Sequence, residues 1–181
     1  MIDCPRIVIG GTGSGAGKTS LALGLVAALR RRGSRVQAFK VGPDFLDPSY
    51  LSIASGRPCY NLDGWMMGRD YVEKLVARVT ADVDIAVIEG VMGLFDGAGH
   101  DSLEGSTAEI AAWLRAPVLL VADVYGMARS LAAVVKGFAT FERKVRVAGI
   151  IANRCGSVRH GIMLAETLRA SRLPPLVAAV P

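Results

Sequence analysis

The sequence predicts an α/β protein with a doubly wound, mostly parallel sheet and helices on both of its faces. Three observations carry this prediction: short apolar runs alternate with helical patterns, the runs have no polar face, and a glycine-rich loop joins the first run to the first helix. Strands without a polar face are typical of parallel sheets, because crossover helices cover both sides. A chain of 181 residues with 51% hydrophobic content can form one such domain, and no shift in composition marks a second.

Six segments are predicted as strands because each is short, apolar and rich in β-branched residues. In chain order they cover residues 6–11, 35–42, 84–91, 117–124, 145–153 and 176–180. In a doubly wound sheet, ligands bind at the carboxyl ends of the strands. We therefore expect the functional residues directly after these segments.

Three segments between the strands are predicted as helices. The first begins at Lys18, carries Leu21 and Leu25 at helical spacing, and ends at Gly33, since glycine commonly terminates helices. The other two amphipathic segments cover residues 126–141 and 159–171. Helices placed between buried strands complete the pattern that a parallel sheet requires.

The net charge of +5 comes from 21 basic and 16 acidic residues. The basic residues are scattered, apart from Arg30, Arg31 and Arg32 at the end of the first helix. At that position they complement the helix dipole, so we expect no nucleic-acid partner. A net positive domain suits an anionic small substrate.

The cysteine pattern and the absence of long apolar runs favour a cytoplasmic protein. Cys4, Cys59 and Cys155 are odd in number and lack the spacing of a metal site, so we expect neither a disulfide framework nor a cysteine metal centre. No apolar run reaches the roughly 18 residues that a membrane span needs, and the N-terminus lacks an export signal. We therefore expect no membrane partner.

The stretch from Ile7 to Ser20 resembles a phosphate-binding loop but departs from the usual pattern by one residue. The pattern G-x-x-x-x-G-K-[ST] requires a glycine where this chain has Thr12, which alters only the entry to the loop. Lys18 supplies a charge, Thr19 supplies a hydroxyl for Mg²⁺, and the glycines let backbone N–H groups converge on phosphate oxygens. The predicted nucleotide-binding residues of this loop are Thr12, Gly13, Ser14, Gly15, Ala16, Gly17, Lys18, Thr19 and Ser20.

Acidic residues follow the predicted strands on the same side as the loop. Asp44 and Asp47 lie in a Pro-containing turn, where turn chemistry alone could explain them. Glu89 ends an apolar run, where a charge is costly without a partner, and Asp96 follows in a glycine-rich segment. Because Mg²⁺ prefers hard oxygen ligands supplemented by phosphates and water, these four acids predict a Mg²⁺ and substrate site, which Asp63 could join.

Five longer motifs extend the pattern across the chain: FKVGPDFLDPSY, GRPCYNLDGWMM, IEGVMGLFDG, STAEIAAWLRAPVLLVADVYGMARSLAAVVKGF and GIIANRCGSVRH. Together they resemble the N-terminal synthetase domain of the cobyrinate and hydrogenobyrinate a,c-diamide synthase family. The loop spacing from Gly11 to Thr19 is similar to that of dethiobiotin synthetase and its relatives. The resemblance implies a P-loop fold of that type and ATP-dependent amidation of two acetate carboxylates of a tetrapyrrole, through an acyl phosphate. The ammonia would come from a glutaminase domain.

The resemblance also implies a role for each candidate residue. Lys18 and the loop N–H groups would hold the phosphates of ATP, and Asn153 would contact its adenine. The implied Mg²⁺ ligands are Thr19, Asp47 and Glu89. Asp44 and Asp96 would orient the substrate or take a proton from ammonia, and Lys40 would face an anionic group of the substrate. The catalytic set is therefore Asp44, Asp47, Glu89, Asp96 and Lys40.

Some features leave alternatives open. A dethiobiotin synthetase-like carboxylation enzyme shares the loop, and a regulatory P-loop ATPase switch would need only the nucleotide site. Leu51 stands where the family usually has a histidine, which leaves the identity and metal state of the tetrapyrrole open. Residues 1–181 contain no glutaminase nucleophile in a glycine-flanked context, so we expect one synthetase domain without the glutaminase half. A homodimer stays open.

Overall fold

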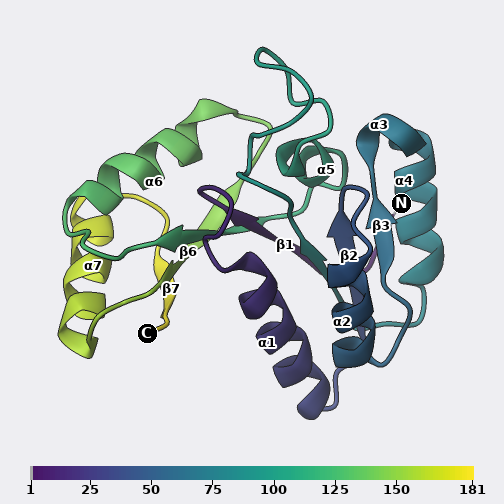
Figure 1. The fold of residues 1–181 in the computed structure, drawn as a ribbon, viewed down its shortest axis with the longest axis horizontal. Coiled ribbons are helices and arrows are strands. Elements are labelled where there is room, and N and C mark those ends of the chain that lie inside the picture. The colour runs from purple at the N-terminus through teal and green to yellow at the C-terminus, as the bar shows by residue number, and fades with distance from the viewer. Residues whose placement is uncertain (1) are drawn as a thin grey trace.

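The structure is a computed structural model that describes residues 2–181, and it contains one parallel sheet covered by helices on both faces (Figure 1). The strands are β1 (Arg6–Gly11), β2 (Val36–Val41), β3 (Tyr60–Leu62), β4 (Ile85–Glu89), β5 (Val118–Asp123), β6 (Val147–Asn153) and β7 (Leu176–Ala179). The helices are α1 (Lys18–Arg31), α2 (Leu46–Ser55), α3 (Gly64–Met67), α4 (Arg69–Val79), α5 (Thr107–Trp113), α6 (Ser130–Phe141) and α7 (Val158–Ala170).

The strand order in the sheet is β3-β2-β4-β1-β5-β6-β7, and all neighbouring pairs are parallel. The chain moves outward in one direction from β1 to β2 and β3, and in the other direction from β1 to β5, β6 and β7. The predicted doubly wound α/β fold is therefore confirmed. The carboxyl ends of β1, β2 and β4 lie side by side, which places the loops that follow them together.

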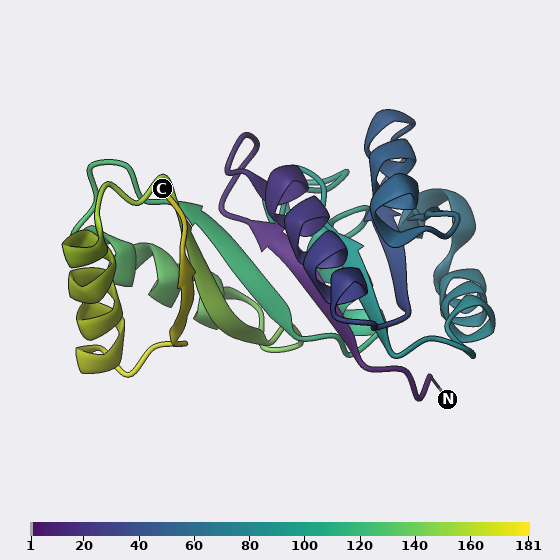
Figure 2. The same cartoon turned by 90° about the horizontal axis from the view of Figure 1, so that it is seen from below.

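Two apolar cores lie on opposite faces of the sheet because successive strand residues point to opposite sides. On one face, Val8 of β1 packs in a core with helices α4, α5, α6 and α7. On the other face, Ile9 packs in a core with Ala22 and Val26 of α1 and Leu51 of α2. Figures 1 and 2 show α1 and α2 together on this second face.

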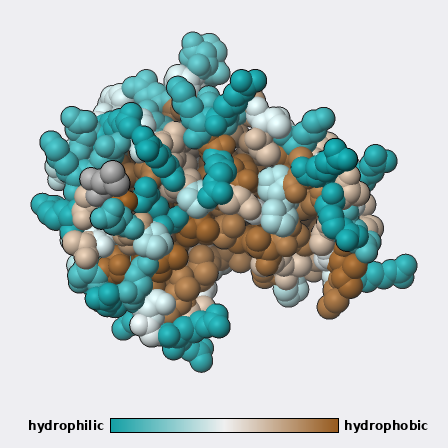
Figure 3. Space-filling model, turned by 180° about the vertical axis from the view of Figure 1, so that it is seen from behind, coloured by the Kyte–Doolittle hydropathy of each residue, from teal (hydrophilic) through white to brown (hydrophobic). Residues whose placement is uncertain are grey.

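The surface differs in character from one part to another. Seen from behind, hydrophilic residues cover much of the upper and outer surface, and an apolar area runs along the lower part (Figure 3). Within residues 2–181, no helix has both the length and the apolar character that crossing a membrane would require.

The structure corrects several local predictions. Asp47 was expected in a turn but lies in the first turn of α2, followed by Pro48. Proline is accepted there because the first N–H groups of a helix have no partner within the helix. The second predicted helix, expected over residues 126–141, begins later, at Ser130, because residues 124–129 form a turn in which Met127 N donates to Val124 O. Helices α2, α3, α4 and α5 and strand β3 were not predicted.

Candidate functional site

The phosphate-loop segment follows β1 and leads directly into α1. Gly15 and Gly17 have φ of 74° and 99°, a region that favours glycine. A side chain at Gly17 would also collide with the amide of Asn153, so both the backbone conformation and the available space favour glycine there. The loop therefore needs glycine at these two positions for its backbone shape. Thr12, where the usual glycine is missing, donates its N–H to Val121 O at 2.9 Å and joins the loop to β5.

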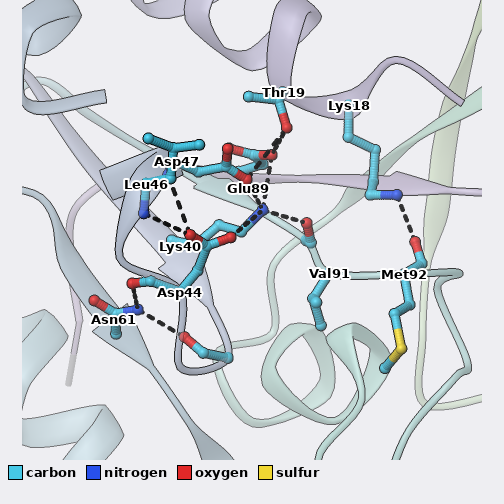
Figure 4. Close-up of polar contacts among 12 residues, drawn as sticks. Lys18, Thr19, Lys40, Asp44, Leu46, Asp47, Asn61, Glu89, Val91 and Met92 are labelled. Atoms are coloured by element: carbon cyan, nitrogen blue, oxygen red, sulfur yellow. Dashed lines mark hydrogen bonds and ion pairs between the residues drawn. The ribbon is translucent and has the colours of Figure 1, made fainter. Parts of the chain in front are cut away.

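Lys18 is the first residue of α1 and is 7% exposed. Its Nζ donates to Gly13 O at 3.0 Å. It also donates to Met92 O at 2.5 Å, as Figure 4 shows. Burial lowers the pKa of Lys18, the nearby Lys40 ammonium lowers it further, and the surrounding carboxylates offset part of the effect. Because an ammonium has three N–H donors, the two carbonyls orient the group and leave one donor for a further acceptor.

Lys40, on β2, lies at the centre of the acidic cluster and is 3% exposed. Its Nζ donates to Asp47 Oδ2 at 2.6 Å, to Glu89 Oε1 at 2.8 Å and to Gly90 O at 3.2 Å, while Asp44 Oδ2 lies 4.0 Å away (Figure 4). The pairing follows from the sheet, because Lys40 of β2 and Glu89 of β4 are register partners. A buried cation thus neutralises the acids that the sequence assigned to a metal.

Thr19 completes the cluster from the side of the phosphate loop. Its hydroxyl lies 2.5 Å from Glu89 Oε1 and 3.3 Å from Asp47 Oδ2. The structure therefore brings together Thr19, Lys40, Asp47 and Glu89, with Asp44 at the edge. Asp44 Oδ1 accepts from the N–H groups of Leu46 and Asp47, so it also caps the start of α2.

The titration of these groups follows from their burial and their partners. Burial opposes the charged form of Lys40, but the hydrogen bonds to Asp47 and Glu89 outweigh it, so the pKa of Lys40 is raised. Burial raises the pKa of Glu89, and the hydrogen bonds from Lys40 and Thr19 offset only part of this rise. Burial is the largest single effect on the Asp47 carboxyl and raises its pKa, but the hydrogen bond and the charge of Lys40, with smaller hydrogen-bond contributions, together outweigh it, so the pKa of Asp47 is lowered.

One atom of the cluster lacks a partner. Glu89 is fully buried, and its Oε2 accepts no hydrogen bond from the described residues. A buried oxygen of this kind is costly unless a donor or cation reaches it. Residues 2–181 contain no group of three or more His, Cys, Asp or Glu side chains arranged to hold a metal, so the protein alone supplies few ligands. Mg²⁺ is commonly held by one or two carboxylates together with phosphates, and this donor set fits that arrangement.

The other candidates lie around this cluster. Asp96 Oδ2 accepts from Gly93 N at 2.8 Å and borders a pocket of about 1180 Å³ that Phe95 and Trp113 also line. Asn153 Nδ2 donates to Ala16 O at 2.9 Å, so this side chain supports the loop directly. In the loop itself, Ser14, Gly15 and Ser20 are exposed.

Asp63 and Leu51 lie outside the cluster. Asp63 accepts from Met66 N and caps α3. It is therefore a structural residue in this geometry. Leu51 belongs to α2 and is fully buried in the core that α2 shares with α1 and the sheet. The side chain at position 51 packs inside the domain. Leucine in place of the family histidine therefore does not directly change the surface of the acidic cluster.

Sequence reasoning missed three contributors to the site. Gly90 and Met92 act through their backbone carbonyls, which no side-chain pattern reveals, although Met92 has a positive φ of 46° that marks unusual backbone. Asn61 Nδ2 donates to Gly42 O and Asp44 O, and thereby holds the loop that carries Asp44. Its position within the motif GRPCYNLDGWMM was the available signal.

The parallel sheet, the glycine loop and the buried Lys18 define a P-loop nucleotide-binding domain. The chain belongs to the CobQ/CobB/MinD/ParA nucleotide-binding domain family, which it matches over residues 7–181. Cobyrinate a,c-diamide synthase of Syntrophotalea carbinolica is 66% identical over 179 residues, which cover 99% of this chain and 39% of that protein. Hydrogenobyrinate a,c-diamide synthase of Mycobacterium tuberculosis is 49% identical over 164 residues, covering 88% of this chain and 36% of that protein.

These relatives confirm the family resemblance that the motifs predicted, and the chain spans less than two fifths of their length. Among solved structures, the cell division protein FtsY of Thermotoga maritima superposes with a TM-score of 0.65 at 19% identity, covering 99% of this chain and 63% of FtsY. The hydrogenase maturation factor HypB of Archaeoglobus fulgidus gives 0.58 at 15% identity, covering 98% of this chain and 81% of HypB. At these identities the likeness concerns the fold alone.

Proposed function

We propose that this domain uses Mg²⁺ and ATP to activate carboxylates of a cobyrinate-type tetrapyrrole for amidation. The observation that carries the proposal is the buried cluster of Thr19, Lys40, Asp47 and Glu89 beside Lys18 of the phosphate loop. The names of the relatives supply the substrate class, since they are cobyrinate and hydrogenobyrinate a,c-diamide synthases.

In the proposed reaction, an oxygen of the substrate carboxylate attacks the γ-phosphorus of ATP. The bond from that phosphorus to the bridging oxygen breaks, and ADP leaves. The nitrogen of ammonia then attacks the carbonyl carbon of the acyl phosphate, phosphate leaves, and the nitrogen loses a proton to yield the amide. Catalysis of the first step is mainly positioning and charge stabilisation. Lys18 and the loop N–H groups would hold the phosphates.

Thr19, Asp47 and Glu89 would hold Mg²⁺, which would neutralise charge on the phosphates. The partnerless Oε2 of Glu89 supports this role, because it offers a buried lone pair on the same carboxylate whose Oε1 accepts from the Thr19 hydroxyl. Mg²⁺ bound by these carboxylates would replace the Lys40 ammonium as their counter-charge. Lys40 would then be free to face an anionic oxygen of the substrate.

Asp44 and Asp96 would orient the substrate or accept the proton that ammonia loses. Asp44 is suited to this because its carboxylate lies at the partly exposed edge of the cluster, 4.0 Å from Lys40. Asn153 would contact the adenine while it supports the loop through Ala16. Ammonia would come from glutamine through a glutaminase domain of the whole enzyme.

The test uses the domain with Mg-ATP, a tetrapyrrole polyacid and hydroxylamine, which traps an acyl phosphate as a hydroxamate. We expect ADP release that depends on the tetrapyrrole and a hydroxamate detected by mass spectrometry, with ammonium salt giving the amide instead. GTP is the matched nucleotide control. ADP release that ignores the tetrapyrrole would favour a regulatory ATPase switch, and ADP release that requires bicarbonate and a diamino acid would favour the carboxylation enzyme.

A further inference from the structure

The segment Gly90 to Met92 connects both buried lysines to the sheet. The carbonyl of Gly90 accepts from Lys40 at 3.2 Å, and the carbonyl of Met92 accepts from Lys18 at 2.5 Å. Val91 lies between them, so its backbone position determines where both carbonyls point. Gly90 N also donates to Ile9 O at 2.9 Å, which ties the start of the segment to β1.

Val91 is held through both of its backbone polar groups by a single side chain. Its N–H donates to Thr107 Oγ1 at 2.9 Å, and the Thr107 hydroxyl donates back to Val91 O at 3.1 Å. Thr107 is the first residue of α5 and is fully buried. Gly90 has no room for a side chain, because a Cβ there would collide with the Thr107 side chain and approach Ile9 O.

The rest of α5 fixes Thr107 independently of Val91. The hydroxyl of Ser106 accepts from Glu109 N at 3.1 Å and caps the helix, and Ala108 N donates to Leu94 O at 2.9 Å. The Thr107 hydroxyl is therefore presented from a rigid helix start. This fully buried hydroxyl has no direct part in the proposed reaction.

We propose that Thr107 is a positioning residue of the nucleotide site. Its hydroxyl fixes Val91, and through Val91 it fixes the Gly90 and Met92 carbonyls that orient the ammonium groups of Lys40 and Lys18. This inference rests on the proposed use of ATP at the loop. A group orienting Lys18 before ATP arrives reduces the cost of ordering it on binding.

The test compares Thr107→Val, Thr107→Ser and Thr80→Val by calorimetric titration with Mg-ATP, alongside thermal unfolding. Thr107→Val keeps the shape of the side chain but removes the hydroxyl, so the N–H and the carbonyl of Val91 both lose their hydrogen-bond partner. We expect ATP affinity to fall about tenfold in Thr107→Val, and Thr107→Ser to restore it to within about threefold of wild type. Thr80→Val is the matched control, because it makes the same change at another buried threonine, whose hydroxyl donates to Val76 O at the end of α4 and does not contact Val91.

If Thr107 has only a general structural role, Thr107→Val and Thr80→Val will both lower the unfolding temperature and both leave the ATP affinity of the folded fraction unchanged. That result would overturn the proposal. If Thr107→Val does not fold, Thr107→Ala removes the hydroxyl without adding a methyl group against Val91, and the same comparison applies to it. Wild-type protein that does not bind Mg-ATP would overturn the proposed function itself. Wild-type binding with equal affinity in the Thr107 variants would overturn only the positioning role.

Discussion

Replacing Lys40 by methionine should destabilise the fold, and the loss should depend on pH. The ammonium of Lys40 is the buried partner of Asp47 and Glu89, at 2.6 and 2.8 Å. Lys40→Met keeps the length of the side chain but leaves two carboxylates without their cation. Removing one partner of a buried ion pair costs about 3–5 kcal/mol. Because the Asp47 side chain is 20% exposed and water screens part of its charge, we expect the lower end of that range at neutral pH.

The pH dependence follows from the direction of each pKa shift. Glu89 has its pKa raised above the ordinary 4.5, so its ionised form costs stability as the pH rises through that region. In Lys40→Met the pKa of Glu89 should rise further, because its cationic partner is gone. In acid Glu89 is then protonated, and the loss of stability caused by its buried charge is absent. The pKa of Lys40 itself is raised above 10.5, so its contribution in the wild type persists through neutral pH and is lost only in strong alkali. The difference in the free energy of unfolding between wild type and Lys40→Met should therefore grow from about pH 5 to about pH 8.

Urea unfolding at these two pH values measures the effect, with Lys136→Met, which removes an exposed cation on α6, as the control. The reasoning would be refuted by a loss below about 1 kcal/mol at pH 8, the size of a surface pair. An equal loss of stability in Lys40→Met at both pH values would also refute the reasoning. Adding Mg²⁺ should recover part of the stability of Lys40→Met, because a divalent cation can take the vacated position between the carboxylates.

Three further substitutions, with Gly24→Ala as a control for one of them, separate the parts of the site. Lys18→Ala should weaken ATP binding by about 2–4 kcal/mol in calorimetry, and unchanged affinity would exclude the loop as the phosphate site. Gly17→Ala should abolish measurable ATP binding, because φ at this position is 99° and the added Cβ meets Asn153. Its counterpart Gly24→Ala, where a Cβ meets nothing within 4 Å inside α1, should instead stabilise the protein by about 0.5–1 kcal/mol in urea unfolding. Asp44→Asn keeps the oxygen that caps α2 and removes only the charge, so hydroxamate formation should fall while ATP affinity stays near wild type. A collapse of ATP affinity would place Asp44 on the nucleotide side.

The strands could be predicted well because each one carries its own signal. The six predicted segments all contain a strand, with ends that agree to within about two residues, the ordinary uncertainty of boundaries. The missing strand, β3, has three residues and is stabilised by pairing with β2, which a local pattern does not contain. Short edge strands depend on their neighbours more than on their own composition.

Two of the helices that were not predicted, α4 and α5, carry recognisable local signals in the sequence. Helix α4 buries Val72, Leu75 and Val76, which have the spacing of an amphipathic helix. Helix α5 begins after Ser106 with Glu109 three residues later, the pattern of a capping box. Helix α2 is different, because its proline and its acidic residues favour a turn in isolation. Its burial of Leu51 against α1 decides the outcome.

The acidic cluster illustrates what a single sequence cannot specify. Lys40 and Glu89 are separated by 49 residues, and each could be recognised only as a charged residue in an otherwise apolar strand. Their contact arises because β2 and β4 are neighbours in the sheet, although β3 separates them along the chain. The burial of Glu89 therefore has two explanations, a Mg²⁺ ion and the Lys40 ammonium, and the sequence offered only the first. The two explanations are compatible if the Lys40 ammonium and Mg²⁺ serve alternately as the cation beside these carboxylates. The effect of Mg²⁺ on the stability of Lys40→Met therefore tests the site without requiring turnover.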